Sequence, residues 1–482
     1  MSELVHTPYE DIPKIRDALK ATFKKGTTRS IAWRQHQLYQ LARMCQENAD
    51  AFCDSLLADL GKPKLEVLMG EVGAVVDRAV RSAQQVEEWA KPEHPEVPDW
   101  QKPWNPTLLK VPRGAVLIIA PWNYPMILSL QPLIGAIAAG CCAVVKPSEL
   151  VPSFSQLLAT LIPKYLDPAA YQVVNGGVAE ASKLLELQWD HIFYTGNGRV
   201  ARVIASAAAK HLTPMTLELG GKSPVIIDSA YDINLAAKRV LWGKCNNAGQ
   251  ICVAPDYILC TWNKQEELIA AFQEHYKAFF PEGALTSPEF GSIVSDLHHQ
   301  RLTSLLQRTK GKIVLGGHSS GRRLEPTIVA NVQEGDALLE EEIFGPILPI
   351  ITVDSLEDAI RFINARPHPL VLYAFTEDPT AKEQLINETQ SGGIVFNDTF
   401  QQLAVNELPF AGVGESGYGY QIMKYTFDTF TQLRSSVDVP KEAEPHMQIR
   451  YPPHGAEAVK ALSAAAYQPI PSSKLPTVNG RM

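Results

Sequence analysis

The sequence lacks the features of secreted, membrane-spanning and nucleic-acid-binding proteins. No stretch approaches the ~18 apolar residues of a membrane-spanning helix, and the first residues do not combine a basic segment with an apolar one, as a signal peptide does. The seven cysteines include no C-x-x-C pair, which argues against a disulfide framework or a zinc site. No Lys/Arg-rich run occurs and the net charge is −8, so a nucleic-acid partner is not expected. These absences predict a cytoplasmic protein without a metal site.

What is present is the composition and patterning of a large globular protein. The 482 residues, of which 45% are hydrophobic and 20% charged, predict two or three packed domains. Residues 1 to about 92 have helical apolar spacing, whereas short apolar runs alternate with helical segments from residue 115 onward. We expect strands at residues 115–120, 143–145, 171–174, 191–194, 257–261, 312–315, 347–353, 370–375 and 394–397. We expect helices at residues 155–166, 179–187, 266–278, 297–309, 356–364 and 456–467.

This alternation predicts parallel sheets built from strand–helix–strand units. Ligands of such sheets bind at the carboxyl ends of the strands. Pro121, Lys146 and Thr195 each stand at such an end, so we expect a ligand site there.

The segment from Asn246 to Cys252 is a candidate for nucleophilic chemistry. Polar amides and a glycine precede Cys252, which suits a loop that presents a side chain to a cleft. The ordinary role of a cysteine is that of a small buried hydrophobe, and we expect that role for Cys141, Cys142 and Cys245.

Glu218 is a candidate general base with a competing interpretation. It ends an apolar run before Gly220-Gly221, and apolar neighbours raise the proton affinity of a carboxylate. Thr195–Ala201, however, follows a predicted strand and resembles a glycine-rich pyrophosphate turn. Glu218 lies about twenty residues after Gly196, the spacing at which such a turn has a ribose-binding acid. An exposed glutamate at a strand end is the third possibility.

Three further segments carry groups suited to a cofactor or an oxyanion. Lys146 and Glu149 offer a cation and a carboxylate for ribose hydroxyls. Asn123 lies in a loop fixed by two prolines, where its amide either binds an oxyanion or satisfies its own turn. In Glu341–Pro346 an acid precedes an aromatic residue by two positions, a spacing that suits a ribose and a nicotinamide ring.

Taken in order, these segments resemble the aldehyde dehydrogenase superfamily over roughly residues 15 to 435. The segment Gly249–Tyr257 and the short N-terminal region are similar to the class 3 branch, which includes fatty aldehyde dehydrogenases. The matching motifs are PWNYP, KPSE, TGxxxV, ELGGKSP, GQxC, EEIFGP, Ser391-Gly-Gly with Asn397, and Leu408-Pro-Phe with Gly412-Val-Gly.

The resemblance implies a role for each matching residue. Cys252 is implied as the nucleophile, Glu218 as the base that activates water, and the Asn123 amide as a donor to the oxyanion. The implied cofactor is NAD, with NADP possible; NAD is favoured because Glu149 would repel a 2′-phosphate. The implied cofactor-binding residues are Trp122, Lys146, Ser148, Glu149, Thr195, Gly196, Asn197, Val200, Leu219, Gly220, Glu342 and Phe344.

The implied fold is α/β with four parts, and the resemblance also implies a homodimer. A Rossmann-like cofactor domain is expected at residues 1–101 and 117–219, and an α/β catalytic domain at 220–395. Residues 102–116 and 396–439 are expected to form a small β bridging or oligomerisation element, followed by a tail at 440–482.

The implied reaction is oxidation of a hydrophobic aldehyde to its acid through a thiohemiacetal and a thioester. Medium- to long-chain aliphatic aldehydes are the first expectation, and aromatic aldehydes and apocarotenals are alternatives. A CoA-acylating enzyme and an inactive cofactor-binding scaffold are the competing functions. Glu218 argues against the first, and the intact set of Cys252, Glu218 and Asn123 against the second.

Three positions depart from the family pattern. Ala201 stands at the last glycine of the cofactor turn, and Asn197 stands where serine is common. The stretch Gly419–Lys424 lacks the histidine usual in class 3, near the substrate mouth of relatives. The last departure leaves the choice of substrate open.

Overall fold

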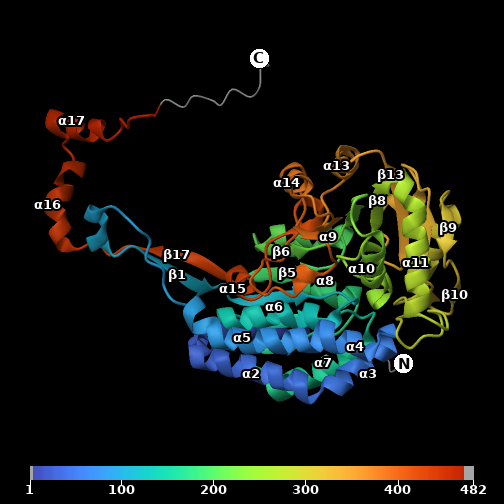
Figure 1. The fold of residues 1–482 in the computed structure, drawn as a ribbon. Coiled ribbons are helices and arrows are strands. Elements are labelled where there is room, and N and C mark those ends of the chain that lie inside the picture. Colours follow the sequence, from blue (N-terminus) through green and yellow to red (C-terminus); the bar gives the residue numbers. More distant parts are fainter. Residues whose placement is uncertain (1–3, 472–482) are drawn as a thin grey trace. The chain divides into compact units, whose positions relative to one another are not determined.

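The computed structural model describes residues 4–471 of the chain (Figure 1). Its larger compact unit joins Lys110–Gln432 with the N-terminal residues up to Lys91. The smaller unit consists of Pro92–Leu109 and the residues from Leu433 onward.

The first sheet of the larger unit has six strands in the order β16-β6-β5-β2-β3-β4. Its strands are β2 (Ala115–Ile119), β3 (Cys142–Lys146), β4 (Tyr171–Val173), β5 (His191–Thr195), β6 (Met215–Glu218) and β16 (Gly417–Tyr418). All neighbours are parallel except β16, which pairs antiparallel to β6. β2, β3 and β5 are buried along their whole length, which explains their uninterrupted apolar sequences.

The register of this sheet places four strand ends side by side. Glu218 pairs with Thr195, and Ile119 pairs with both Tyr194 and Lys146. The carboxyl ends of β6, β5, β2 and β3 therefore form one continuous edge, where doubly wound sheets bind their ligands.

Ten helices and one π-helix accompany this sheet in the described chain. They are α1 (Asp11–Lys25), α2 (Ile31–Glu47), α3 (Ala49–Leu60), α4 (Lys64–Val67), the π-helix η2 (Leu68–Gly73), α5 (Ala74–Trp89), α6 (Pro125–Ala139), α7 (Pro152–Tyr165), α8 (Val178–Glu186), α9 (Gly198–Ala209) and α15 (Lys424–Thr429). Side chains cap the first turns of α2 and α9. At the start of α2, Ser30 Oγ accepts a hydrogen bond from the Trp33 N–H at 3.4 Å. α1 and α6 both contact β2 and β3.

The second sheet has seven strands in the order β15-β14-β7-β8-β13-β12-β9, of which only β9 is antiparallel to its neighbour. Its strands are β7 (Pro224–Ile227), β8 (Tyr257–Thr261), β9 (Lys312–Leu315), β12 (Thr327–Ala330), β13 (Ile347–Val353), β14 (Val371–Phe375) and β15 (Gly393–Phe396). The associated elements are α10 (Ile233–Cys245), α11 (Gln265–Phe279), α12 (Asp296–Arg308), α13 (Leu356–Asn364), α14 (Pro379–Glu388) and the hairpin β10 (Ser319–Ser320) with β11 (Arg323–Leu324).

The two sheets are joined by the five residues from Leu219 to Ser223, between β6 and β7. This short connection keeps the carboxyl end of β6 close to the amino end of β7. The chemistry-bearing loops of both sheets therefore meet in the region between these two ends.

The smaller unit holds the remaining α-helices of the described chain and parts of two strands. β1 (Thr107–Pro112), which begins in it, pairs with β17 (Thr431–Ser436) in a two-stranded sheet, and α16 (Glu444–Met447) and α17 (Ala456–Ala464) follow. Trp100 and Trp104 pack edge to face with ring centroids 5.1 Å apart. Within residues 4–471 no helix combines the length and apolarity needed to cross a membrane. Residues 472–482 of the predicted tail lie outside the described residues.

The predicted α/β class is confirmed, and several strands match to the residue, among them 257–261 and 347–353. The prediction of a single helix after residue 439 is wrong, because α16 precedes α17, and α17 ends at Ala464 rather than Tyr467. Cys142 is buried, as expected, and begins β3. β10, β11 and β16 were not predicted, because two-residue strands carry no periodicity.

Candidate active site

Three loops meet at the amino edge of the second sheet. Gly220, Cys252 and Glu342 precede β7, β8 and β13 respectively, and these strands are parallel neighbours. Residues that precede parallel neighbours lie at the same edge, so distant sequence segments come together there. Glu218, at the carboxyl end of β6, faces the same region.

Cys252 differs from the other six cysteines in its access to solvent. All seven are free thiols and six are buried, whereas Cys252 is partly exposed. Burial of the sulfur, followed by the charges of Glu342 and Glu218, raises the pKa of the Cys252 thiol to about 12. Both carboxylates therefore lie within electrostatic reach of the sulfur. At neutral pH the thiol is protonated and must lose its proton before it can attack.

A strained turn presents this thiol. Asn247, Ala248 and Gly249 all have left-handed backbones, with φ of 47°, 50° and 71°. Such values cost roughly 1–3 kcal/mol at each non-glycine residue and persist only where surrounding contacts impose them. One such contact is close: a β-carbon on Gly249 would lie 2.3 Å from the Gly345 carbonyl oxygen. The loop that carries Glu342 therefore packs directly on the turn that carries Cys252.

Asn123 is tied to the same turn through its amide. Its Nδ2 donates to the Gln250 carbonyl oxygen at 3.0 Å, and its side chain is only 4% exposed. The backbone carbonyl oxygen of Asn123 accepts from Lys62 Nζ at 3.0 Å and from Asn247 Nδ2 at 2.8 Å. Since a primary amide has two N–H groups, one remains for an oxyanion.

Glu218 is a buried carboxylate without a hydrogen-bond partner in the described chain. It is 2% exposed, and neither side-chain oxygen has a partner among residues 4–471. Burial raises the pKa of Glu218 well above its usual range, and the nearby Gln421 amide partly opposes this rise. The backbone is fixed, because the Glu218 carbonyl oxygen accepts from the Gly196 N–H at 3.0 Å. A desolvated carboxylate held in this way suits proton transfer.

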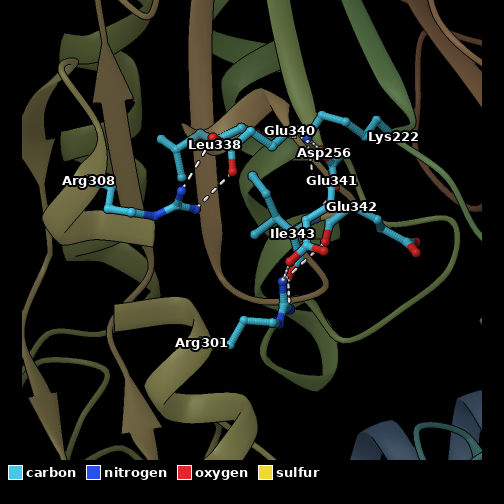
Figure 2. A network of polar contacts seen from close by, with 9 residues as sticks. All are labelled: Lys222, Asp256, Arg301, Arg308, Leu338, Glu340, Glu341, Glu342 and Ile343. Carbon is cyan, nitrogen blue, oxygen red and sulfur yellow. Dashed lines mark hydrogen bonds and ion pairs between the residues drawn. The ribbon is translucent and has the colours of Figure 1, made fainter. Parts of the chain in front are cut away.

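The loop around Glu342 is held by the polar network shown in Figure 2. Arg301 donates to Glu341 Oε1 at 3.0 Å and to the Glu342 carbonyl oxygen at 3.3 Å. Lys222 pairs with Asp256, whose Oδ2 accepts from the Ile343 N–H at 2.9 Å. Because Asp256 follows Cys252 closely in the chain, this network links the two loops.

The network leaves the Glu342 carboxylate against the glycine turn between the sheets. A β-carbon on Gly220 would lie 2.4 Å from Glu342 Oε2. Burial, followed by the charge of Asp256, raises the pKa of Glu342 to about 8. Phe344 is edge-on to Trp122, with centroids 5.4 Å apart, and His298 meets Trp122 at 5.2 Å. Trp122 and Phe344 thus form an aromatic pair beside the loop that carries Glu342.

The carboxyl edge of the first sheet has groups that fit a dinucleotide. Lys146 Nζ contacts Glu149 Oε2 at 3.2 Å, and burial lowers the pKa of Lys146. Thr195 Oγ1 is buried and has no partner among the described residues. Such an unsatisfied hydroxyl beside Gly196, at the start of α9, suits the polar atoms of a cofactor.

The other predicted cofactor residues lie along this edge or beside it. Asn197 Oδ1 accepts from the Val200 N–H at 3.0 Å and so caps α9. Ser148 Oγ accepts from the Leu150 N–H at 3.3 Å, and Leu219 is buried beside Glu218. Asn197 and Ser148 therefore have local structural roles whether or not they contact a cofactor.

The family pattern described as Aldehyde dehydrogenase family matches residues 2–436, about nine-tenths of the chain. The chain belongs to the aldehyde dehydrogenase family. It is thus an NAD(P)-dependent enzyme that oxidises aldehydes, and the resemblance inferred from its motifs is confirmed.

This aldehyde dehydrogenase is similar to several curated relatives. It is 43% identical over 420 residues to the 4,4′-diaponeurosporen-aldehyde dehydrogenase of Staphylococcus aureus, covering 87% of this chain and 92% of the relative. It is 40% identical over 449 residues to the dimeric, NADP-preferring aldehyde dehydrogenase of Canis lupus familiaris, covering 93% and 99%. A solved substrate-bound state of Staphylococcus aureus AldH superposes with a TM-score of 0.91 at 40% identity, covering 95% of this chain and 99% of that one.

Several residues that shape the aldehyde dehydrogenase site were not predicted from the sequence. They are Lys62, Glu71, Asn247 and Gln250, which hydrogen-bond to the functional loops, and Gln421, whose amide opposes the rise in the pKa of Glu218. The motif around Cys252 contains Asn247 and Gln250, so their proximity to the thiol was a usable signal. No comparable signal marked Lys62 and Glu71.

The charge of Glu342 gives a pH-dependent test of the site geometry. We expect Glu342→Gln to lower the pKa of Cys252, since it removes a negative charge that raises it. More thiolate then exists at a given pH, so iodoacetamide should alkylate Cys252 several-fold faster. Because the pKa of Glu342 is about 8, the gain should appear above pH 8 and vanish near pH 6, where Glu342 is uncharged.

The alkylation rate is measured without cofactor across this pH range. Glu341→Gln, which changes the exposed neighbour that pairs with Arg301, serves as the matched control and should leave the rate unchanged. An equal gain at pH 6 and pH 9 would contradict the electrostatic explanation.

Proposed function

We propose that this aldehyde dehydrogenase oxidises hydrophobic aldehydes, with Cys252 as nucleophile, Glu218 as general base and Asn123 as oxyanion donor. The observation that carries these roles is the convergence at Cys252. It is the one cysteine of seven that is not buried, and the charges of Glu218 and Glu342 both reach its sulfur. The Asn123 amide is bonded to the turn that presents it.

In the first half of the proposed reaction, Cys252 Sγ forms a bond to the aldehyde carbon. Its proton is released to water, since Cys252 is partly exposed. The carbonyl electrons move onto oxygen, and this oxyanion accepts hydrogen bonds from Asn123 Nδ2 and the Cys252 N–H. The bound nicotinamide cofactor supplies an acceptor for the hydride of this adduct, so that a thioester remains.

In the second half, Glu218 takes a proton from water and the resulting hydroxide attacks the thioester carbon. The carbon–sulfur bond breaks and the acid leaves, and the proton held by Glu218 passes to the departing thiolate, which restores the thiol and the carboxylate. A raised pKa suits this step, because an ionised Glu218 in an apolar setting is a strong proton acceptor. The raised pKa also predicts that hydrolysis accelerates as pH rises.

For the cofactor we propose that Lys146 and Glu149 hold the adenosine ribose and that Glu342 holds the nicotinamide ribose. Gly196 and the start of α9 would hold the pyrophosphate, and Phe344 would pack near the nicotinamide. NAD is favoured over NADP, because the charge of Glu149 opposes a 2′-phosphate. Because the canine relative is named as NADP-preferring, both NAD and NADP are compared in the activity test.

The proposed substrate is a medium- to long-chain aliphatic aldehyde. An apocarotenal is the second candidate, supported by the relative named for 4,4′-diaponeurosporen-aldehyde. A homodimer is supported by the canine relative named as dimeric, and a cytoplasmic location by seven free cysteines. We also propose that the chain has four parts: the cofactor domain, the catalytic domain, the bridging element and the tail.

The substrate class is tested by following NADH or NADPH absorbance with hexanal, hexadecanal, benzaldehyde and an apocarotenal. We expect kcat/KM to rise at least about tenfold from hexanal to hexadecanal, since two buried methylenes at about 0.8 kcal/mol each suffice for that gain. A higher value for the apocarotenal than for hexadecanal would select the second candidate. No turnover with any aldehyde and either cofactor, despite tight NAD binding, would indicate an inactive scaffold.

A further inference from the structure

A buried ion pair lies behind the loop that carries Asn123. Lys62 Nζ and Glu71 Oε1 are 2.6 Å apart, and both side chains are 0% exposed. Lys62 follows α3, and Glu71 lies in the π-helix η2. Neither residue belongs to the motifs that identify the family in this sequence.

The hydrogen bonds of the Lys62 ammonium join Glu71 to the Asn123 loop. Besides Glu71, its Nζ donates to the Asn123 carbonyl oxygen at 3.0 Å. The same ammonium lies 3.6 Å from the centre of the Tyr124 ring, a close cation–π contact. Lys62 therefore grips two consecutive residues of the Pro121–Pro125 loop.

Glu71 fixes the other side of this loop. Its Oε2 accepts from the Met126 N–H at 2.8 Å and from the Ile127 N–H at 3.3 Å. Both N–H groups belong to the first turn of α6, where the helix itself offers no acceptor, and the N-cap residue of α6 makes no side-chain cap. Glu71 supplies the missing acceptor. A π-helix shifts the side-chain register by a part of a turn, a device found at functional sites. Here η2 presents Glu71 to α6.

The backbone of Asn123 is thus fixed by hydrogen bonds, and this sets the direction of its side chain. Its carbonyl oxygen accepts from Lys62 and from Asn247 Nδ2, and the Asn123 amide donates to Gln250. If Lys62 is removed, the carbonyl keeps only the bond to Asn247, and the backbone that carries the amide can rotate. Oxyanion donors must lie within a few tenths of an ångström of their target.

We infer that the Lys62–Glu71 ion pair is a positioning device for the Asn123 amide, and through it for the oxyanion of the aldehyde adduct. This inference rests on the proposed function, which assigns the oxyanion to Asn123. A fully buried ion pair contributes little net stability compared with apolar side chains of equal size. Its geometric contacts with Asn123 and α6 therefore explain its presence better than stability does.

The test compares Lys62→Met and the double variant Lys62→Met/Glu71→Gln with Lys64→Met. The double variant leaves no lone charge at position 71, and its glutamine oxygen can still accept from α6, so we expect it to fold. Lys64 is the matched control, because its ion pair with Asp50 at 2.7 Å is exposed, with side chains 64% and 82% accessible. Lys64→Met should change no parameter by more than twofold.

For the two Lys62 variants we expect kcat for aldehyde oxidation to fall about 10- to 100-fold, the scale of a misaligned catalytic group. The Kd for NAD and the rate of Cys252 alkylation by iodoacetamide should stay within twofold of wild type, since alkylation forms no oxyanion. A more than tenfold loss of alkylation would show a general collapse of the site and overturn the inference. Wild-type kcat in the double variant would overturn it as well.

A double-mutant cycle with Asn123→Ala separates this inference from the proposed function. If Lys62 acts through Asn123, adding Lys62→Met to Asn123→Ala lowers kcat no further. If the two losses multiply, Lys62 acts elsewhere and the inference is wrong while the proposed function stands. If Asn123→Ala alone leaves kcat within twofold of wild type, the oxyanion assignment itself fails, and the positioning role fails with it.

Discussion

Replacing Cys252 by alanine is expected to lower aldehyde-dependent NADH formation by at least about 10⁴-fold, because removal of a nucleophile leaves only binding and oxyanion contacts. The sulfur forms the covalent adduct from which hydride leaves, and no other cysteine in the chain has comparable access. The Kd for NAD should stay within about twofold. Turnover is measured by NADH absorbance and NAD binding by calorimetry.

Cys245→Ala is the matched control, since Cys245 ends α10 just before the strained turn and is buried. Its loss removes a small apolar contact and should leave kcat within a few-fold of wild type. Residual turnover above one per cent in Cys252→Ala, with Cys245→Ala unaffected, would show that the reaction does not pass through a thioester on Cys252.

Glu218→Gln is expected to separate the two halves of the reaction. Thioester formation should continue, so one NADH per active site appears in a burst, and steady-state turnover then falls about 10²- to 10⁴-fold, the usual contribution of a general base. Intact-protein mass spectrometry should show the acyl group on the Cys252 peptide. The amide has nearly the same volume as the carboxylate, and neither Glu218 oxygen has a partner to lose in the described chain.

The pH dependence gives a second measure of the same role. Burial raises the pKa of Glu218, so hydrolysis in the wild type should rise with pH as the carboxylate ionises. Glu218→Gln should abolish this rise. Glu415→Gln, which alters an exposed partner of Arg202 near β16, should preserve it. Absence of a burst together with normal hydrolysis would place the base on another residue.

Much of the fold could be predicted because its strands are short, buried and continuous in apolar sequence. β2, β8 and β13 are examples, and each is followed by a helical segment. The loops near Cys252, Glu218 and Glu342 were found as candidates because each motif combines a reactive side chain with glycine or proline. The catalytic role of each residue came from the family resemblance, since a lone glutamate at a strand end can be a base, a ribose ligand or an exposed surface residue.

The remaining features depend on contacts between residues far apart in the chain. Gly417 pairs with Glu218 across an antiparallel strand of two residues, and no local pattern indicates it. Nothing in the local sequence distinguishes Lys62 and Glu71 from exposed residues; their burial follows from contacts with Asn123 and Met126, which lie far along the chain. The left-handed φ of Ala248 contradicts its local preference and is imposed by packing.

That backbone strain sets an order of events in the making of the enzyme. The turn before Cys252 adopts its conformation against local preference, so the contacts that hold it must already exist. Gly345, which packs on Gly249, is synthesised almost a hundred residues later. A nascent chain that has just released Cys252 from the ribosome therefore lacks the contact that holds this turn. The geometry of the turn is completed only when the loop that carries Gly345 has packed on Gly249.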